Sequence, residues 1–232
     1  MKKQFQFNKL DLLFICAVAI LFLSCIATTY HTAETLHPGQ GSLSPGYMQA
    51  RSTEEFTETP VQLLGTSGRI GISKRFEFGA EHVLDISKDN DHLFSSVWGD
   101  LKVQLSNKDK LIRKPIISTG FMKGYAYHEE AGVHFTTIPI LFSIKPTARF
   151  APTFQYRLEF LSDGFIPAEL EDPRHTFALG FEYSLRELSP EKWDPRIAFS
   201  IGTLNSLSGS SDDPGILLFN FGFKINTPYK IK

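Results

Sequence analysis

The stretch GRIGISKRFEFGAEHVLDIS, residues 68–87, decides the fold of this chain. In its second half Phe76 and Phe78 fall on one face and Glu77 on the other, and the alternation continues to the end of the stretch. Side chains alternate in this way across a β-strand, whereas a helix would repeat every 3.6 residues. Because a short polar break at residues 73–75 joins two alternating runs, the stretch predicts an antiparallel hairpin.

The same period of two recurs along the rest of the chain, without a convincing amphipathic helix. The alternation therefore predicts an all-β protein. We expect strands at residues 41–50, 61–73, 75–86, 95–105, 114–127, 133–144, 147–161, 175–186, 196–204 and 215–225.

Alternation alone does not say which face of each strand meets water. The apolar faces are uniformly bulky and aromatic, with 21 Phe in the chain, and would overfill a small closed core. The polar faces mix Gly, Ala and Ser with charged residues, as a narrow interior requires. The strands are also about as long as a tilted strand needs to cross a bilayer. These features predict a single antiparallel up-and-down transmembrane β-barrel of about ten strands, apolar outward and polar inward.

The connections between strands support this topology. Tight connections at residues 73–75, 106–110 and 145–146 alternate with longer ones at residues 51–60, 87–94, 162–174 and 205–214. Outer-membrane barrels place short periplasmic turns and long extracellular loops at opposite rims, with an even number of strands. The connections at residues 129–132 and 187–195 do not follow this alternation.

The N-terminus is typical of an exported protein. Lysines precede the apolar run at residues 10–23, which predicts a signal peptide over residues 1–24. The tetrapeptide Phe22, Leu23, Ser24, Cys25 resembles a bacterial lipobox, which implies lipidation at Cys25. Plain cleavage near Ala27 and an uncleaved anchor are the alternatives. We expect a periplasmic lead-in over residues 25–40 and the barrel over residues 41–232.

Composition excludes several classes of function. The formal net charge is -1, so the chain has no basic field for nucleic acid, and we expect no nucleic-acid partner. The two cysteines, Cys16 and Cys25, both precede the barrel, which leaves it without a disulfide or a Cys metal site. We expect no cofactor and no metal.

The leader, the segment TAETLHPGQG (residues 32–41), the hairpin GISKRFEFG and the last strand LLFNFGFKI together resemble small, porin-like outer-membrane β-barrel proteins of bacteria. The resemblance covers nearly all of the mature chain. It implies a location in the bacterial outer membrane and an assembly signal in the aromatic last strand. It specifies no activity, because pores, enzymes and adhesins share this architecture.

Charged residues on the predicted inner faces are the candidate functional groups. They are Arg69, Glu77, Glu81, Asp100, Lys102, Arg149, Arg157, Glu159, Glu182, Arg186 and Lys224. They would line a selective polar pathway or form a closed network of ion pairs. Barrels of about eight strands are filled by their own side chains, whereas open channels have about sixteen or more. We therefore favour a plugged or very narrow interior.

Other polar residues are weaker candidates. His82, His128, His134 and His175 fall near the outer rim, but no spacing joins a nucleophile, a base and an orienting group, so we expect no enzyme. The acidic loops at residues 89–91 and 212–213 lack a calcium-loop pattern. Aromatic residues are expected in girdles at the membrane interfaces. These are Trp98, Tyr125, Tyr127, Tyr156, Tyr183 and Trp193.

The sequence thus predicts an outer-membrane barrel with a narrow or plugged polar lumen, acting as a structural or surface-interaction protein or as a narrow solute pathway. Its expected partners are outer-membrane lipid and small solutes or surface ligands. One alternative is an exported soluble or lipid-anchored barrel that binds an apolar ligand, and another is an outer-membrane hydrolase.

Overall fold

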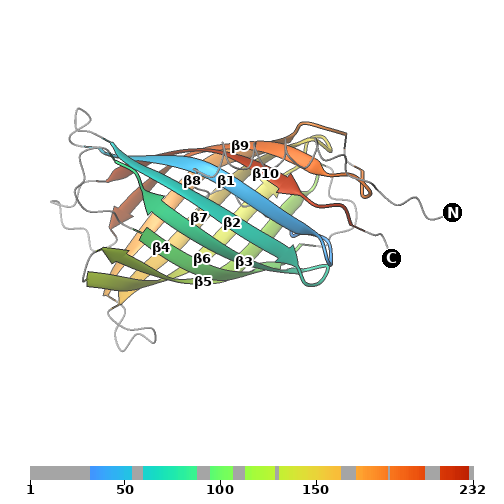
Figure 1. The fold of residues 1–232 in the computed structure, drawn as a ribbon. Coiled ribbons are helices and arrows are strands. Elements are labelled where there is room, and N and C mark those ends of the chain that lie inside the picture. Colours follow the sequence, from blue (N-terminus) through green and yellow to red (C-terminus); the bar gives the residue numbers. More distant parts are fainter. Residues whose placement is uncertain are drawn as a thin grey trace, which may run out of the picture.

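The chain forms a closed barrel of antiparallel strands in the computed structural model, which describes residues 32–53, 60–87, 95–106, 113–128, 131–162, 171–187, 189–206 and 215–229. Figure 1 shows the strands tilted around one common axis. The strands are β1 (Gly41–Ser52), β2 (Val61–Gly71), β3 (Phe76–Asp85), β4 (Ser95–Gln104), β5 (Pro115–His128), β6 (Ala131–Ile144), β7 (Phe150–Ser162), β8 (Glu171–Ser184), β9 (Asp194–Ser206) and β10 (Ile216–Asn226). The all-β barrel of about ten strands predicted from alternation is confirmed.

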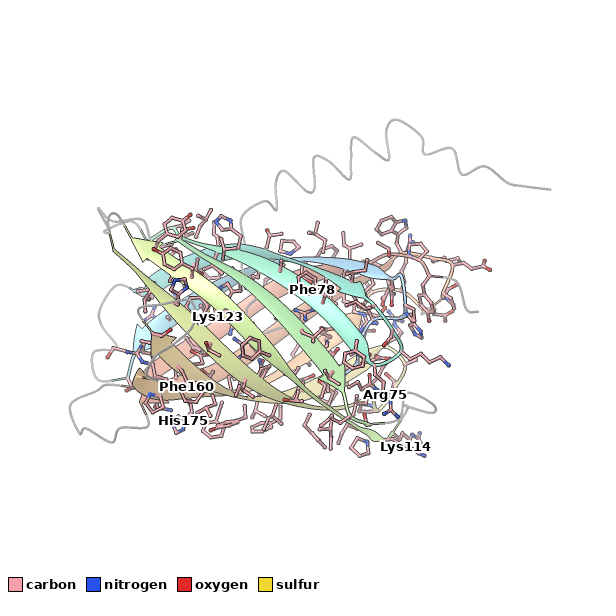
Figure 2. All side chains as sticks on the ribbon, turned by 90° about the horizontal axis from the view of Figure 1, so that it is seen from below. Arg75, Phe78, Lys114, Lys123, Phe160 and His175 are labelled. Carbon is pink, nitrogen blue, oxygen red and sulfur yellow. The ribbon has the colours of Figure 1, made fainter. Side chains whose placement is uncertain are left out.

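Every strand pairs with its neighbours in sequence, and β1 closes the ring by pairing with β10. The backbone N–H of Thr227 donates to the carbonyl of Gly41 at 2.8 Å, so the start of β1 and the end of β10 meet at one end of the barrel. We call this the terminal end and the opposite end the loop end. In Figure 2, Arg75 and Lys114 lie toward the terminal end, and Phe160 and His175 toward the loop end. No helix among the described residues is long and apolar enough to span a membrane.

The outer face of the barrel is apolar. Phe154 and Phe221, whose direction tests the predicted orientation, are 38% and 56% exposed. Large apolar side chains are exposed on every strand from β1 to β10, among them Leu43, Ile70, Phe78, Val97, Phe121, Ile140, Phe154, Leu179, Ile201 and Phe221. A closed sheet with such a surface satisfies its backbone hydrogen bonds internally and suits hydrocarbon as its solvent. The chain is therefore a transmembrane β-barrel.

The opposite face of each strand is buried inside the barrel and is mostly polar. In β3 the burial alternates at every residue, with Glu77 and Glu81 inside and Phe76 and Phe78 outside. Ser67, Ser118, Thr137 and Asn220 are at most 1% exposed. Side chains of this kind leave little free space between opposite walls of a barrel with so few strands.

One side of the interior near the loop end carries an apolar patch. Met48, Leu63, Val83 and Leu218 form a buried cluster there, contributed by β1, β2, β3 and β10. These residues share the inward face with the charged residues farther along the same strands. Asp85 and Ser96 are buried beside this cluster, so it forms an apolar patch on one side of a mostly polar interior.

One residue predicted for an interfacial girdle lies inside the barrel instead. Trp98 has the same strand parity as Asp100 and Lys102, and its ring packs 4.3 Å from the ring of Phe135. Tyr125 and Tyr127 do lie on the outer face, 41% and 42% exposed. The aromatic pair of Trp98 and Phe135 therefore fills part of an interior that was predicted to be polar.

A charge placed on the outer face tests the orientation of the barrel. Phe221→Arg, in the middle of β10, should lower the free energy of unfolding in lipid vesicles by about 2–4 kcal/mol, because it places a cation against hydrocarbon. Leu185→Arg, just beyond the end of β8, is the control and should cost only about 0–1 kcal/mol. Equal effects in urea titrations would contradict the apolar-outward orientation.

Candidate functional site: a plugged barrel mouth

Residues 32–40 lie inside the terminal end of the barrel, and we call them the plug segment. Thr32, Ala33, Thr35 and Leu36 are all at most 7% exposed. Ala33 packs in a buried apolar cluster with Ile116 of β5 and Leu141 of β6. This part of the predicted lead-in therefore fills the mouth of the barrel.

The barrel wall supplies acceptors for the backbone amides of the plug segment. The N–H of Ala33 donates to Ser143 Oγ at 2.9 Å, and the N–H of Leu36 donates to Glu77 Oε2 at 2.8 Å. The N–H of Thr35 donates to Gln104 Oε1 at 3.0 Å. Buried amides need such partners, so these side chains fix the path of the segment.

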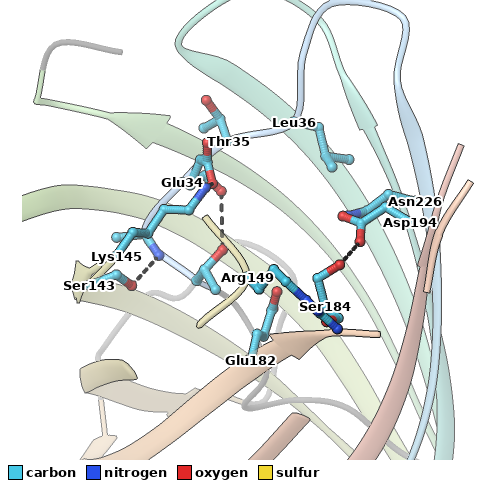
Figure 3. Close-up of polar contacts among 12 residues, drawn as sticks. Glu34, Thr35, Leu36, Ser143, Lys145, Arg149, Glu182, Ser184, Asp194 and Asn226 are labelled. Carbon is cyan, nitrogen blue, oxygen red and sulfur yellow. Dashed lines mark hydrogen bonds and ion pairs between the residues drawn. The ribbon is translucent and has the colours of Figure 1, made fainter. Parts of the chain in front are cut away.

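Lysines of the barrel wall bind the carbonyl and carboxylate groups of the same segment. Lys102 Nζ donates to the carbonyls of Thr32 and Glu34, both at 3.1 Å. Lys145 Nζ lies 2.6 Å from the Glu34 carboxylate, and Figure 3 shows the two side chains together at the mouth. The plug segment is thus held by donors and acceptors from several strands.

The segment then turns tightly against β2. Gly39 has a φ of 75°, a conformation that glycine adopts without strain, and the N–H of Gln40 donates to the carbonyl of His37 at 2.9 Å. The N–H of Gly39 donates to Gly71 O at 2.8 Å, and the N–H of Gly71 donates to Gln40 O at 2.9 Å. A Cβ on Gly71 would overlap the His37 carbonyl, so the close approach of the two chains depends on glycine there.

A buried ion network lies beneath the plug segment. The Arg69 guanidinium pairs with the carboxylates of Glu77 and Asp100, and Lys102 Nζ lies 3.1 Å from Glu77 Oε1. These side chains are at most 6% exposed. Charges buried this deeply are tolerated when they are paired and hydrogen-bonded.

A second network lines the opposite wall of the mouth. Glu182 pairs with Lys224 and with Arg196, both at 3.1 Å. Arg196 also pairs with Asp194 at 2.6 Å. Ser184 Oγ donates to Asp194 at 2.5 Å, and Figure 3 shows this bond. The wall of the mouth therefore carries paired charges of both signs. Lys102 of the first network also binds the plug segment.

The structure places most of the predicted charges in the interior. Those at most 7% exposed are Arg69, Glu77, Glu81, Asp100, Lys102, Arg157, Glu182 and Lys224. The Arg157 guanidinium interacts electrostatically with the carboxylates of Glu159, Glu81 and Asp100. Glu159 is partly exposed and accepts a hydrogen bond from Thr176 Oγ1 at 3.5 Å.

Two of the predicted charges do not line the interior. Arg149 precedes β7, its guanidinium lies 5.0 Å from the ring centroid of Tyr183 on the outer face, and its Nε donates to Ser184 O at 3.0 Å. Arg186 is exposed and follows the end of β8. β7 and β8 are both shorter at the terminal end than predicted. Arg149 and Arg186 therefore lie in turns, where the alternation of faces no longer applies.

Four residues in the ion pairs of the mouth were not predicted: Glu34, Lys145, Asp194 and Arg196. Arg196 had a readable signal, because it shares strand parity with the inward Ala198 and Ser200. The other three lie beyond the predicted strands, where alternation gives no information.

The described histidines contact neighbouring side chains. His82 Nε2 lies 3.0 Å from Ser95 Oγ, which also lies 3.2 Å from the Val83 carbonyl. His134 packs against Tyr125 and His175 against Phe177. The His128 side chain, both acidic loops and residues 1–31, including Cys25, lie outside the described residues. The part of the chain that the structure describes contains no group of three or more His, Cys, Asp or Glu placed to hold a metal ion.

Comparison with known proteins identifies no family for this chain. No family model matches it, and no curated protein matches it. Solved structures with a similar barrel include the N-terminal domain of OprF from Pseudomonas aeruginosa, with 8% identity and a TM-score of 0.34 over 82% of this chain and 99% of that chain. An outer membrane channel from Pseudomonas putida F1 has 7% identity and a TM-score of 0.41 over 87% and 99%. The outer membrane protease OmpT from Escherichia coli has 12% identity and a TM-score of 0.34 over 84% and 98%.

Likenesses at these TM-scores carry no argument about this chain. Its architecture rests on its own strand pairing, and its chemistry on the residues of the mouth.

The ion network predicts a strong effect of removing its central cation. Arg69→Met should lower the free energy of unfolding by roughly 3–5 kcal/mol, because Asp100 and Glu77 lose a buried partner. Arg75→Met, in the exposed turn after β2, is the control and should change stability by less than about 0.5 kcal/mol. The double variant Arg69→Met with Asp100→Asn should recover part of the loss in urea titrations, and strictly additive losses would contradict the direct pairing.

Proposed function

We propose that this protein is a bacterial outer-membrane barrel that forms a narrow pathway for small polar solutes, held closed by its own plug segment. The apolar outer face and the paired charges of the inner face support a barrel in a bilayer. The two short turns after β2 and β6, at residues 72–75 and 145–149, support placing the terminal end in the periplasm.

The burial of the plug segment within the mouth carries this proposal. Its pairing with the wall as a strand is limited, among the described residues, to an isolated bridge between Pro38 and Gly71. It is otherwise attached through side chains, such as Lys102 and Lys145, that could be exchanged for water or solute. A segment held by exchangeable polar contacts can leave the mouth without breaking the barrel sheet.

An apolar patch near the loop end favours a second function. Met48, Leu63, Val83 and Leu218 cover one side of the interior with side chains that would not solvate a passing polar solute. A barrel whose remaining interior is filled by its own polar side chains would act as a structural or surface-interaction protein. The same permeability experiment separates the two functions.

Removal of residues 32–40 should open the pathway. Proteoliposomes with the full chain should swell slowly in an isosmotic solution of a small sugar, and those with the deletion variant should swell clearly faster, because the mouth loses its filling. If the deletion variant folds and swells no faster than the full chain, the pathway is wrong and the structural barrel is favoured.

A single methyl group should have a similar effect to the deletion. Gly71→Ala places a Cβ against the His37 carbonyl, so the plug segment must move away at a cost of about 1–3 kcal/mol. Gly68→Ala, in the same strand, is the matched control, because its Cβ would meet nothing within 4 Å. Swelling should rise for Gly71→Ala and stay at the level of the unchanged chain for Gly68→Ala. If swelling became faster with both variants, its cause would be a change in β2 and not the displacement of the plug segment.

A further inference from the structure

A cavity of about 260 Å³ lies between the plug segment and the wall of the mouth. Its lining includes Thr35 and His37 of the plug segment, Lys224 of β10, and the turn residues Ser189 and Lys192 at the terminal end. The volume is far above the roughly 10–15 Å³ that a single water requires. The cavity therefore has room for a small solute that arrives from the terminal end.

The charges around the cavity favour an anion. Lys145, Lys192, Arg196 and Lys224 line it, together with the carboxylates of Glu34 and Asp194. Glu182 lies behind this lining and pairs with Lys224 and Arg196. Four cations against three carboxylates leave one positive charge among the described groups of the site. Neighbouring cations of this kind strengthen hydrogen bonds to a carboxylate or a phosphate.

The lining also has hydrogen-bonding capacity for uncharged groups. Asn226 is 2% exposed and donates through Nδ2 to Asp194 at 3.1 Å, while its buried Oδ1 accepts no hydrogen bond from the described residues. Burial, with the nearby carboxylates of Glu34 and Asp194, raises the pKa of Tyr229, so its phenol stays a neutral donor. Asn226 Oδ1 is too enclosed for a ligand to reach, whereas the Tyr229 phenol can donate to a ligand hydroxyl or carboxylate.

The Glu34 carboxylate shows where an anion would be held. It lies 2.6 Å from Lys145 Nζ and interacts electrostatically with Arg196 across the cavity. A free carboxylate in the cavity would compete with Glu34 for the same ammonium group.

We propose that this cavity binds a small hydroxylated organic anion, which takes the Lys145 ammonium from Glu34. Binding would then remove one of the contacts that hold the plug segment in the mouth. This consequence for opening rests on the proposed pathway, whereas the binding site itself does not.

Calorimetric titration of the full-length protein in detergent with gluconate tests the site, and sorbitol serves as the uncharged control of similar size. Gluconate should bind and sorbitol should not, and the affinity should fall as the KCl concentration rises. Lys145→Met should weaken gluconate binding about tenfold, because it removes a charge-assisted hydrogen bond. Lys114→Met is the matched control, because it removes an exposed lysine at the same end that does not line the cavity.

The variant Glu34→Gln gives a change of opposite sign. It removes the internal competitor, so gluconate should bind several-fold more tightly although the plug segment loses an ion pair. Equal binding of gluconate and sorbitol, no binding of either, or an unchanged affinity in Lys145→Met would overturn the site. If gluconate binds as expected while the deletion of residues 32–40 does not speed swelling, the anion site stands and the pathway fails.

Discussion

Closure of the sheet on itself is the constraint on which the rest of this structure depends. Because β1 pairs with β10, each strand has a hydrogen-bonded neighbour on both sides and can lie in hydrocarbon without an unsatisfied edge. Closure also divides every strand into an outer and an inner face. Bulky apolar residues such as Phe221 occupy the first, and the second must fit a narrow space. The charges on the inner face are therefore paired with one another and with the plug segment.

The barrel could be predicted from the sequence because its signal is local and repeated. In β3 the order of Phe76, Glu77 and Phe78 already gives the two faces, and the structure follows it residue by residue. The signal failed at strand ends, where Arg149 and Arg186 continue the pattern in sequence while the backbone has turned away. The signal also holds for Trp98, whose parity with Asp100 places it inside, although tryptophan is typical of the membrane interface.

The plugged mouth could not be predicted in the same way. The plug segment is polar and rich in turn residues, which is equally typical of a linker. Many of its hydrogen bonds to the wall are made by its backbone amides and carbonyls, such as the bond from the N–H of Leu36 to Glu77. Because backbone groups are the same in every sequence, they give no signal that could be read in advance. The cavity depends on residues far apart in the chain, with Glu34, Lys145 and Asn226 contributed by three segments that only the closed barrel brings together. Neither spacing nor composition contains that information.

The groups that contact the plug segment, which we call its seat, come from distant parts of the chain. The groups that receive residues 32–40 come from β2, β3, β4 and β6, and beyond β10 the ring of Tyr229 stacks on His37 with centroids 3.9 Å apart. Tyr229 lies beyond the last strand, so the complete seat draws on both ends of the described chain. Residues 32–40 precede every strand in the sequence, yet all of their contacts are made only when β10 and the residues after it are in place.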